Sequence, residues 1–423
     1  MYFLRVILFS TLLFGQKMNW QSVLETEYKR ITDSYQLETA FVIGLVDHGK
    51  LVYSTGFGPI AIGSDKIIDK ETPIYIASST KTFTATLLRL LQEEGRLSLT
   101  DPLSKRLPEF KPLDQSIHPD QISIRQLLTH THGIANNIAQ WESALLGYDG
   151  GNKHLLNLLN KYSSAMDSKD FRYSNLGPVM AGIIYENNTR ENWQDGMMRQ
   201  IFGPLRLKKT SAKISDYNQD EIAQSIYVNS NGQAWSTFKK TNEIMSAAGG
   251  IMSTVSDLSH WLAVFMNEGK LAGKQVIPKQ VIHDVLFDTV PQNRSYLTYK
   301  RYAYSLGWDH AINNGERTLT RFGGFGGTSM HISFIPERKL GVIAFSNADR
   351  NPSLPHVMAN LLYNLVLEKA DWKAHLKEDE QSIKTGIDRM MQNRQETKAL
   401  AISESQQKQY LGRYKNDSGW PDV

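Results

Sequence analysis

The chain of 423 residues contains no cysteine. This absence excludes disulfide bonds, zinc–thiolate centres, iron–sulfur clusters and a cysteine nucleophile. It does not identify a compartment, and it is compatible with an oxidising one.

The chain also lacks a strong excess of charge of either sign. It has 47 basic and 43 acidic side chains, which leaves a formal net charge of only +4. No basic run with interleaved aromatic residues accompanies this small excess. The charge pattern therefore gives no reason to expect a nucleic acid as partner.

Long hydrophobic runs are absent except near the N-terminus. There Arg5 precedes a short apolar run over residues 6–15. One positive charge before a run too short to span a bilayer is typical of a signal peptide. We expect residues 1–16 to be a signal peptide and the protein to be exported, to the periplasm or the extracellular space. An uncleaved anchor and a buried N-terminal strand are the alternatives, and only an uncleaved segment would attach the chain to a membrane.

Several catalytic signatures are missing as well. The chain has no Gly-x-Ser-x-Gly elbow and no His-Glu-x-x-His, and no Lys-Ser/Thr follows the glycine run at residues 323–327. His130 and His132 stand two residues apart without a third ligand cluster, so we interpret them as hydrogen-bonded structural histidines near a cleft. We expect no metal and no cofactor.

Strand patterns open and close the chain, and a helical block lies between them. The strand patterns cover residues 37–56, 317–322, 329–335 and 341–345. Helical periodicity covers residues 80–94, 122–129, 153–162, 176–187, 192–201, 255–268 and 354–368. We expect an α/β (α+β) fold in which one antiparallel sheet, built from both ends of the chain, is flanked by helices. A helical lobe is inserted at about residues 97–250, and the cleft between the lobes is the expected small-molecule site.

Ser78 and Lys81 form a Ser-x-x-Lys pattern. Residues three apart lie on one face of a helix, so the lysine amine reaches the serine hydroxyl. A serine is a weak nucleophile until a base takes its proton, and burial can lower a lysine pKa enough for that task. Two further matches begin at Ser236 and Ser405. Only Ser78 follows a β-rich run and opens an amphipathic helix, so we interpret the other two as ordinary surface residues.

Six segments in order resemble the class C β-lactamase and penicillin-binding-protein family of serine hydrolases. They are residues 76–110, 122–134, 171–186, 246–262, 304–309 and 322–347, and the resemblance covers roughly residues 37–367. It implies that Ser78 is the nucleophile and Lys81 its activating partner. It also implies that Tyr173 exchanges protons with Ser78 or a leaving group, and that Asn175 positions Lys81 and the substrate amide.

The third motif departs from this family. Relatives usually have Lys or His, then Thr or Ser, then Gly, whereas this chain has Arg321, Phe322 and Gly323. Arginine keeps the charge but is no base at neutral pH, so we expect Arg321 to hold a substrate carboxylate. Gly323 and Gly324 let a substrate backbone approach the strand. By resemblance, the Gly324 amide joins the Ser78 amide in an oxyanion hole.

These observations predict a serine hydrolase that forms an acyl-enzyme on Ser78. Its substrate is a small molecule or peptide: an ester, a D-amino-acid peptide or amide, or a β-lactam. We favour a general hydrolase over a resistance β-lactamase, because no extra carboxylate outside the three motifs is evident to activate the deacylating water. A non-catalytic binding or sensor module is the alternative, which the Arg321 departure keeps open.

The hydrolase domain is expected to cover residues 21–368. Residues 371–409 are polar and charged and predict a linker helix, and residues 410–414 resemble the first strand of a small C-terminal extension. Residues 371–423 are thus interpreted as a linker helix and the start of an extension that is either poorly packed from about residue 405 or truncated. The alternative is an ordinary tail whose strand docks on the edge of the main sheet. The literal Lys-Thr-Gly at residues 384–386 has no flanking strand pattern, and we interpret it as a coincidental solvated turn.

Overall fold

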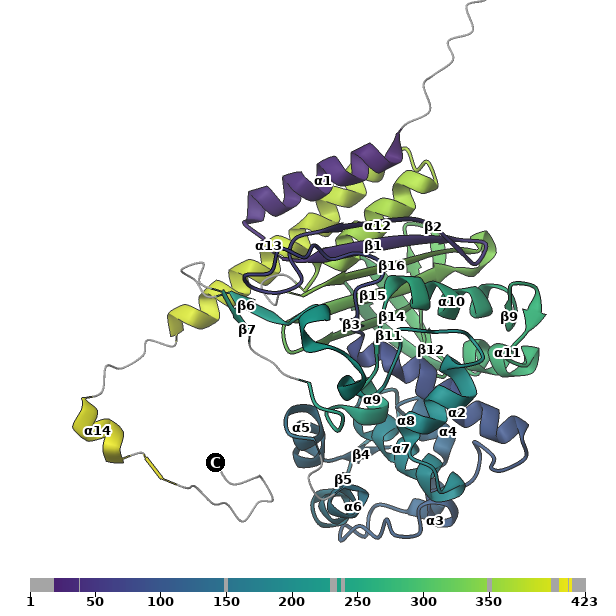
Figure 1. Cartoon of the computed structure of the whole chain (residues 1–423). Helices are drawn as coiled ribbons and strands as arrows, with labels where there is room; N and C mark the ends of the chain where they lie inside the picture. The colour runs from purple at the N-terminus through teal and green to yellow at the C-terminus, as the bar shows by residue number, and fades with distance from the viewer. Residues whose placement is uncertain are drawn as a thin grey trace, which may run out of the picture.

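The computed structural model describes residues 19–37, 39–147, 151–228, 234–236, 240–347, 352–396, 403–409 and 411–412. A central sheet lies between two layers of helix, and a lobe of helices lies below it (Figure 1). The expected signal peptide, residues 1–16, lies outside the described residues. Within the described ranges, no helix combines the length and apolar character needed to cross a membrane.

The large sheet has eight antiparallel strands in the order β11-β12-β13-β14-β15-β16-β1-β2. Their bounds are Phe41–Asp47 (β1), Lys50–Phe57 (β2), Val290–Tyr296 (β11), Tyr299–Tyr304 (β12), Asp309–Asn313 (β13), Glu316–Phe325 (β14), Thr328–Ile335 (β15) and Leu340–Ser346 (β16). β1 pairs with β16 from Phe41 opposite Ser346 to Asp47 opposite Leu340. The prediction of one sheet built from both chain ends is therefore confirmed.

Three strands of this sheet, β11 to β13, were not predicted. β11 is an edge strand with mostly exposed polar residues and a proline, Pro291, so it carries no apolar alternation. β12 alternates buried and exposed positions, but its buried positions include Arg301. A search for apolar residues at every second position therefore does not find either β11 or β12.

Helices cover both faces of the sheet (Figure 1). One face carries α1 (Trp20–Tyr35), α12 (Leu354–Val366) and α13 (Trp372–Glu396); the other faces α2 (Thr80–Glu93), α10 (Val255–Met266) and α11 (Lys279–Phe287). Successive side chains of β1 alternate between these layers: Phe41 packs with the first set, and Val42 with the second. Burial on both sides explains why this strand is almost continuously apolar.

The helical lobe carries most of the remaining elements. Its helices are α3 (Leu103–Arg106), α4 (Ile124–Leu128), α5 (Asn137–Leu145), α6 (Gly151–Tyr162), α7 (Leu176–Thr189), α8 (Trp193–Met197), a π-helix (Met198–Phe202) and α9 (Ser246–Gly249). Short two-stranded sheets complete the structure, and not all of them lie in the lobe (Figure 1). Their strands are β3 (Ile74–Tyr75), β4 (Ile134–Ala135), β5 (Ser164–Ala165), β6 (Ile226–Val228), β7 (Ala234–Ser236), β8 (Met252–Ser253), β9 (Lys270–Leu271) and β10 (Lys274–Gln275). α7 crosses α4 so closely that a Cβ on Gly177 would lie 2.2 Å from the Leu127 carbonyl oxygen. This contact fixes the start of α7, where the Tyr-x-Asn motif lies.

The C-terminal region corrects the expected domain boundary. α13 is no solvated linker in its first half, because Leu376 and Ile383 are buried against α12 and the sheet. Asp379 is buried too, and its carboxylate accepts hydrogen bonds from Thr298 and Asn360. The compact domain therefore continues past residue 368.

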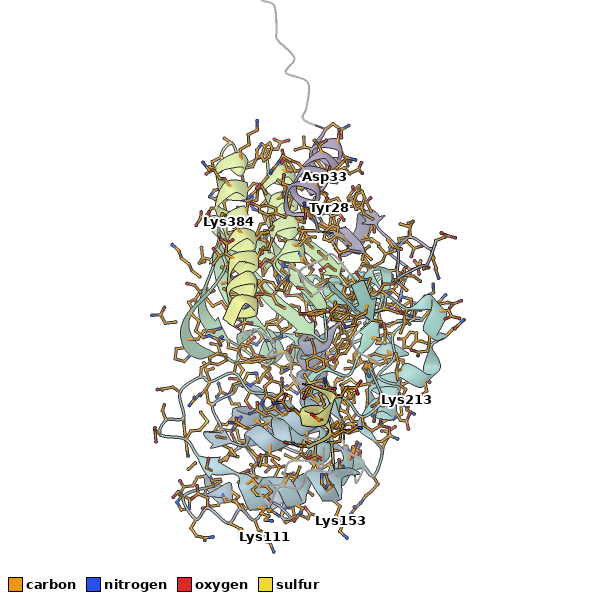
Figure 2. The ribbon with its side chains drawn as sticks, turned by 90° about the vertical axis from the view of Figure 1, so that its left-hand side faces the viewer. Tyr28, Asp33, Lys111, Lys153, Lys213 and Lys384 are labelled. Atoms are coloured by element: carbon orange, nitrogen blue, oxygen red, sulfur yellow. The ribbon has the colours of Figure 1, made fainter. Side chains whose placement is uncertain are left out.

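Two further expectations concern the Lys-Thr-Gly sequence at residues 384–386 and the strand at residues 410–414. Lys384, Thr385 and Gly386 are exposed, as expected, but they lie within α13 and form no turn (Figure 2). Residues 404–409 form a fully exposed helix, α14 (Glu404–Gln409). The predicted strand at residues 410–414 lies outside the described residues, except for Leu411 and Gly412, which are not in a strand.

Replacing Ile383 with alanine should destabilise the domain, because a fully buried isoleucine leaves a cavity between α13 and α12. We expect the free energy of unfolding in urea to fall by about 2 to 5 kcal/mol. Lys384→Ala is the matched control, since its exposed side chain pairs only with Asp388; it should change stability by less than about 0.5 kcal/mol. Equally small effects of both changes would show that α13 is a detachable linker.

Candidate functional site

Ser78 lies at the tight turn that joins β3 to α2. It is the middle residue of a short 3-10 helix, η1 (Ala77–Ser79), and Ala77 adopts φ +44°, a left-handed conformation that is costly for a residue with a Cβ. Strand β14 packs directly on this turn. A Cβ on Gly323 would lie 2.3 Å from the Ile76 carbonyl oxygen and 3.1 Å from the Ser78 nitrogen. Only glycine lets β14 come this close to Ser78.

Lys81 projects from the first turn of α2 toward Ser78. Its Nζ lies 3.2 Å from Ser78 Oγ, and it donates to Asn175 Oδ1 at 2.7 Å and to the Ala248 carbonyl at 2.8 Å. The three contacts use all three N–H groups of an ammonium ion. Burial lowers the pKa of Lys81 to about 8, with a further lowering by Arg321 that Tyr173 opposes. An uncharged amine is therefore accessible near neutral pH.

Tyr173 is the second group in contact with the Ser78 hydroxyl. Its phenol donates to Ser78 Oγ at 2.8 Å and accepts from Arg321 Nη2 at 2.8 Å. Lys81 Nζ and the Arg321 guanidinium lie 4.9 Å and 5.0 Å from the centre of its ring. Burial alone raises the pKa of Tyr173, but the cationic Arg321 and Lys81 lower it to about 8. The phenolate is thus far more accessible than in a free tyrosine.

Arg321 holds this arrangement together from β14. Its Nε donates to the Ser78 carbonyl at 3.1 Å, and its Nη1 contacts Tyr304 Oη at 3.3 Å and Asp309 Oδ2 at 3.5 Å. Burial lowers the pKa of Arg321, but Tyr173, Tyr304 and Asp309 outweigh it, so the guanidinium stays charged. With the bond to Tyr173, four of its five N–H groups have protein acceptors. Arg321 therefore cannot form a bidentate pair of hydrogen bonds with a substrate carboxylate. Its geometry suits holding the Tyr173 oxygen.

His130 supports the loop that carries Tyr173. Its Nδ1 accepts from the Ser174 N–H at 3.2 Å, so Nε2 carries the proton and faces Tyr304 Oη at 3.1 Å. Burial and the nearby Lys81 hold the pKa of His130 well below its usual range. His132 is also buried, and its Nδ1 accepts from the Ile134 N–H at 3.1 Å. Both are hydrogen-bonded beside the cleft, as the sequence predicts.

Tyr304 and Asp309 are two contacts of Arg321 that the sequence did not single out, and it also missed Arg301 of the cavity wall. Tyr304 and Asp309 lie in the segment 304–309, which was noted only as one of the six resembling stretches. Their contacts with Arg321 arise because β12, β13 and β14 are neighbours in the sheet. Since two of these strands were not predicted, this part of the site could not be assembled from the sequence.

A cavity of about 300 Å³ opens beside Ser78. It is lined by Ser78, Tyr173, Arg294, Tyr296, Arg301, Asp309, Arg321, Phe322, Gly323, Gly324, Ser329 and Pro352. Gly324 is thus on the same cavity as Ser78, and its oxyanion role stays a prediction. Among the described residues, no group of three or more His, Asp or Glu side chains is placed to hold a metal ion.

Arg301 is a nearly buried charge of this cavity. It is 9% exposed, and its Nε has no hydrogen-bond partner. The guanidinium stacks 4.9 Å from the Tyr296 ring centre and 5.1 Å from that of Phe322, while its Nη2 lies 3.6 Å from Asp309 Oδ2. Phe322, which stands where relatives carry a hydroxyl, therefore packs against a cation that lines the cavity.

Comparison with known proteins identifies a family. The Beta-lactamase family model matches residues 28–364. Protein flp of Staphylococcus aureus (strain COL) is 25% identical over 325 residues, a match that covers 77% of this chain and 62% of that protein. The chain thus spans less than two thirds of the length of this relative.

Solved structures show the same fold. The octameric penicillin-binding protein homologue from Pyrococcus abyssi superposes with a TM-score of 0.71 at 23% identity, covering 83% of this chain and 78% of that one. The D-amino acid amidase from Ochrobactrum anthropi SV3 gives 0.67 at 18% identity, covering 81% and 98%. At these identities the likeness extends to the fold alone.

Arg321→Gln should raise the pKa of Tyr173 by about 1 to 3, because removing a cation in contact with the phenol destabilises the phenolate. NMR titration of ring-labelled tyrosines measures it, with the Tyr173 signal assigned by its loss in Tyr173→Phe. Arg317→Gln is the control: Arg317 lies on the same strand and pairs with Glu337 at the surface. An unchanged Tyr173 pKa in a folded Arg321→Gln protein would contradict the electrostatic role of Arg321.

Proposed function

The chain belongs to the Beta-lactamase family, and on that basis we propose that it is a serine hydrolase that works through an acyl-enzyme on Ser78. Family membership and the amidase-like fold support a hydrolase. The observation that carries the finer proposal is the position of the Ser78 hydroxyl, within hydrogen-bond distance of both Lys81 Nζ and Tyr173 Oη.

Acylation follows from this geometry. The Ser78 proton moves to the Tyr173 phenolate or to the neutral Lys81 amine, both reachable because their pKa values are about 8. Ser78 Oγ then bonds to the substrate carbonyl carbon, and the carbonyl oxygen takes the negative charge beside the Ser78 and Gly324 amides. When the intermediate collapses, the bond to the leaving group breaks, and the group that took the proton, Tyr173 or Lys81, returns it to the leaving group. Water later cleaves the ester and frees Ser78.

The cavity favours esters and D-amino-acid peptides or amides over β-lactams as efficient substrates. Rapid release of a β-lactam acyl group needs a base for the attacking water. Asp309 is the only carboxylate among the residues that line the cavity, and its oxygens contact Arg301, Arg321 and Gln292. Both Asp309 oxygens are thus engaged with neighbouring side chains, which leaves no free carboxylate oxygen for that water.

A negatively charged group on the substrate fits the same cavity. Arg294 and Arg301 line it together with Arg321, and Asp309 is the one opposing charge among the lining residues. Arg301 makes no side-chain hydrogen bond to a described residue; its Nε is buried, so its terminal Nη groups are the ones available to a ligand. Four of the five N–H groups of Arg321 already have protein acceptors. We therefore assign the anion-holding role, expected of Arg321, to Arg301.

The non-catalytic alternative has less support. A protein that only binds its ligand has no need for a serine hydroxyl held between two groups of lowered pKa.

We also propose, from the apolar run at residues 6–15 alone, that the protein acts after export.

Ser78→Ala should abolish covalent labelling by a fluorophosphonate probe, because no other serine is expected to be activated. Peptide mass spectrometry of the unmodified protein should place the label on Ser78, with ester turnover lost in the variant. Ser79→Ala is the neighbouring control and should keep the label. A protein that is not labelled, and whose ligand binding is the same with and without the Ser78 hydroxyl, would establish the non-catalytic alternative.

Arg301→Gln should discriminate between substrates by charge. We expect KM for the 4-nitrophenyl monoester of succinic acid to rise about tenfold, with little change for neutral 4-nitrophenyl butyrate, since one charge-assisted contact is lost. Arg301→Lys should give an intermediate value. Lys300→Gln, an exposed neighbour on the same strand, is the control. Equal losses for both esters would mean that Arg301 only supports the cavity wall.

A further inference from the structure

A second and larger hollow, of about 820 Å³, lies at the opposite face of α10 from α2. On α10 it is lined by Ser256, Ser259, His260 and Ala263, which recur at helical spacing on one side, and the C-cap residue Asn267 follows them. Trp261 lies on the other side of the helix, where it stacks on Phe83 of α2 at 3.9 Å. None of the residues around this hollow lines the Ser78 cavity.

Three further segments complete this basic hollow. They contribute His48, Gly49, Lys50 and Leu51 from the β1–β2 hairpin, Lys270, Leu271, Ala272 and Gly273 from the β9–β10 hairpin, and Arg206. Figure 1 shows both hairpins beside α10. A Cβ on Gly49 would lie 2.5 Å from Asn267 Nδ2, so the first hairpin turn rests directly on the helix. The β1–β2 hairpin and α10 lie far apart in the sequence, so this part of the wall of the hollow is formed by tertiary packing.

The charge around the basic hollow is of one sign. Its lining contains no aspartate or glutamate. Lys50, Arg206 and Lys270, from three separate segments, make no side-chain hydrogen bond or ion pair to any other described residue. The acids nearby are already engaged: Asp47 contacts His48, and Glu268 pairs with Lys279. Among the described residues, Lys50 and Arg206 are thus left without an ion pair, and Lys270 has only the attraction of Glu268, whose carboxylate already pairs with Lys279.

The same hollow also offers apolar surface. Leu51, Ala263 and Leu271 line it between the cations. His260 donates through Nδ1 to the Leu205 carbonyl, which leaves Nε2 as its second polar atom. A concave, partly apolar surface with a few convergent polar groups is the usual form of a small-molecule site. A simple inorganic anion would leave the apolar part unused, and a neutral lipid would leave the cations unused.

We propose that the basic hollow binds an amphipathic organic anion: an apolar chain or ring that ends in a phosphate, sulfate or carboxylate group. The head group contacts Lys50, Arg206 and Lys270, and the apolar part lies on Leu51, Ala263 and Leu271. This site is separate from the Ser78 cavity and does not depend on the function proposed for it.

Isothermal titration calorimetry with decyl phosphate, below its micelle concentration, tests the proposal on the full chain. We expect one site per chain, with binding weakened about tenfold or more in Lys50→Glu/Arg206→Glu, because two attractive contacts become repulsive. Lys111→Glu/Lys153→Glu is the matched control. It changes the net charge equally at two exposed lysines of the helical lobe (Figure 2), and binding should stay within about threefold of the unmodified protein.

Two further titrants separate the sources of such an anion. Inorganic phosphate should bind much more weakly than decyl phosphate, and equal affinities would overturn the amphipathic class. Binding to phosphatidylglycerol vesicles without binding to dispersed decyl phosphate would overturn a small-molecule site in favour of a membrane surface. Decyl phosphate binding that is equally strong in both double variants, each with unchanged circular dichroism, would place the ligand elsewhere and refute the proposal.

Discussion

Two buried cations face one phenol, and the site is organised around this constraint. Lys81 and Arg321 are both buried and repel each other, and the Tyr173 ring and oxygen lie between them. Lys81 belongs to α2, Arg321 to the sheet, and Tyr173 to the segment before α7. The bonds Arg321–Tyr173 and Lys81–Asn175 therefore connect the sheet and α2 to the helical lobe. The same contacts that lower the pKa values also join the two parts of the molecule.

The local parts of this site were predictable, and the parts that depend on strand order were not. Ser78 and Lys81 share a helix turn, so their spacing was sufficient, whereas Tyr173 and Asn175 were identified through the resemblance to the family. The partners of Arg321 lie on strands whose buried positions are partly polar, and apolar alternation could not reveal them. α13 did carry a signal: Leu376 and Ile383 stand seven residues apart, one helix face in an otherwise charged stretch. Average polarity concealed that face.

Buried polar contacts extend from the cavity wall to the C-terminal helix. Tyr296, which lines the cavity, contacts His356 of α12 at 3.2 Å, and His356 contacts His331 of β15 at 3.0 Å. One turn further along α12, Asn360 accepts from the Tyr299 hydroxyl and donates to Asp379 of α13. α12 thus presents polar side chains to the sheet at helical spacing. The wall opposite Ser78 is supported by a segment that composition alone assigns to a linker.

The pairing of β1 with β16 has a consequence for the order of events during synthesis. Ser78, Lys81 and Tyr173 are all made before β14, which carries Arg321, and before β16, which closes the sheet on β1. Contacts between such distant segments form slowly and late. A nascent chain therefore holds the serine and its two proton acceptors before the arginine that binds the Tyr173 oxygen. The full arrangement around the phenol forms only after β14 has packed on the turn that carries Ser78.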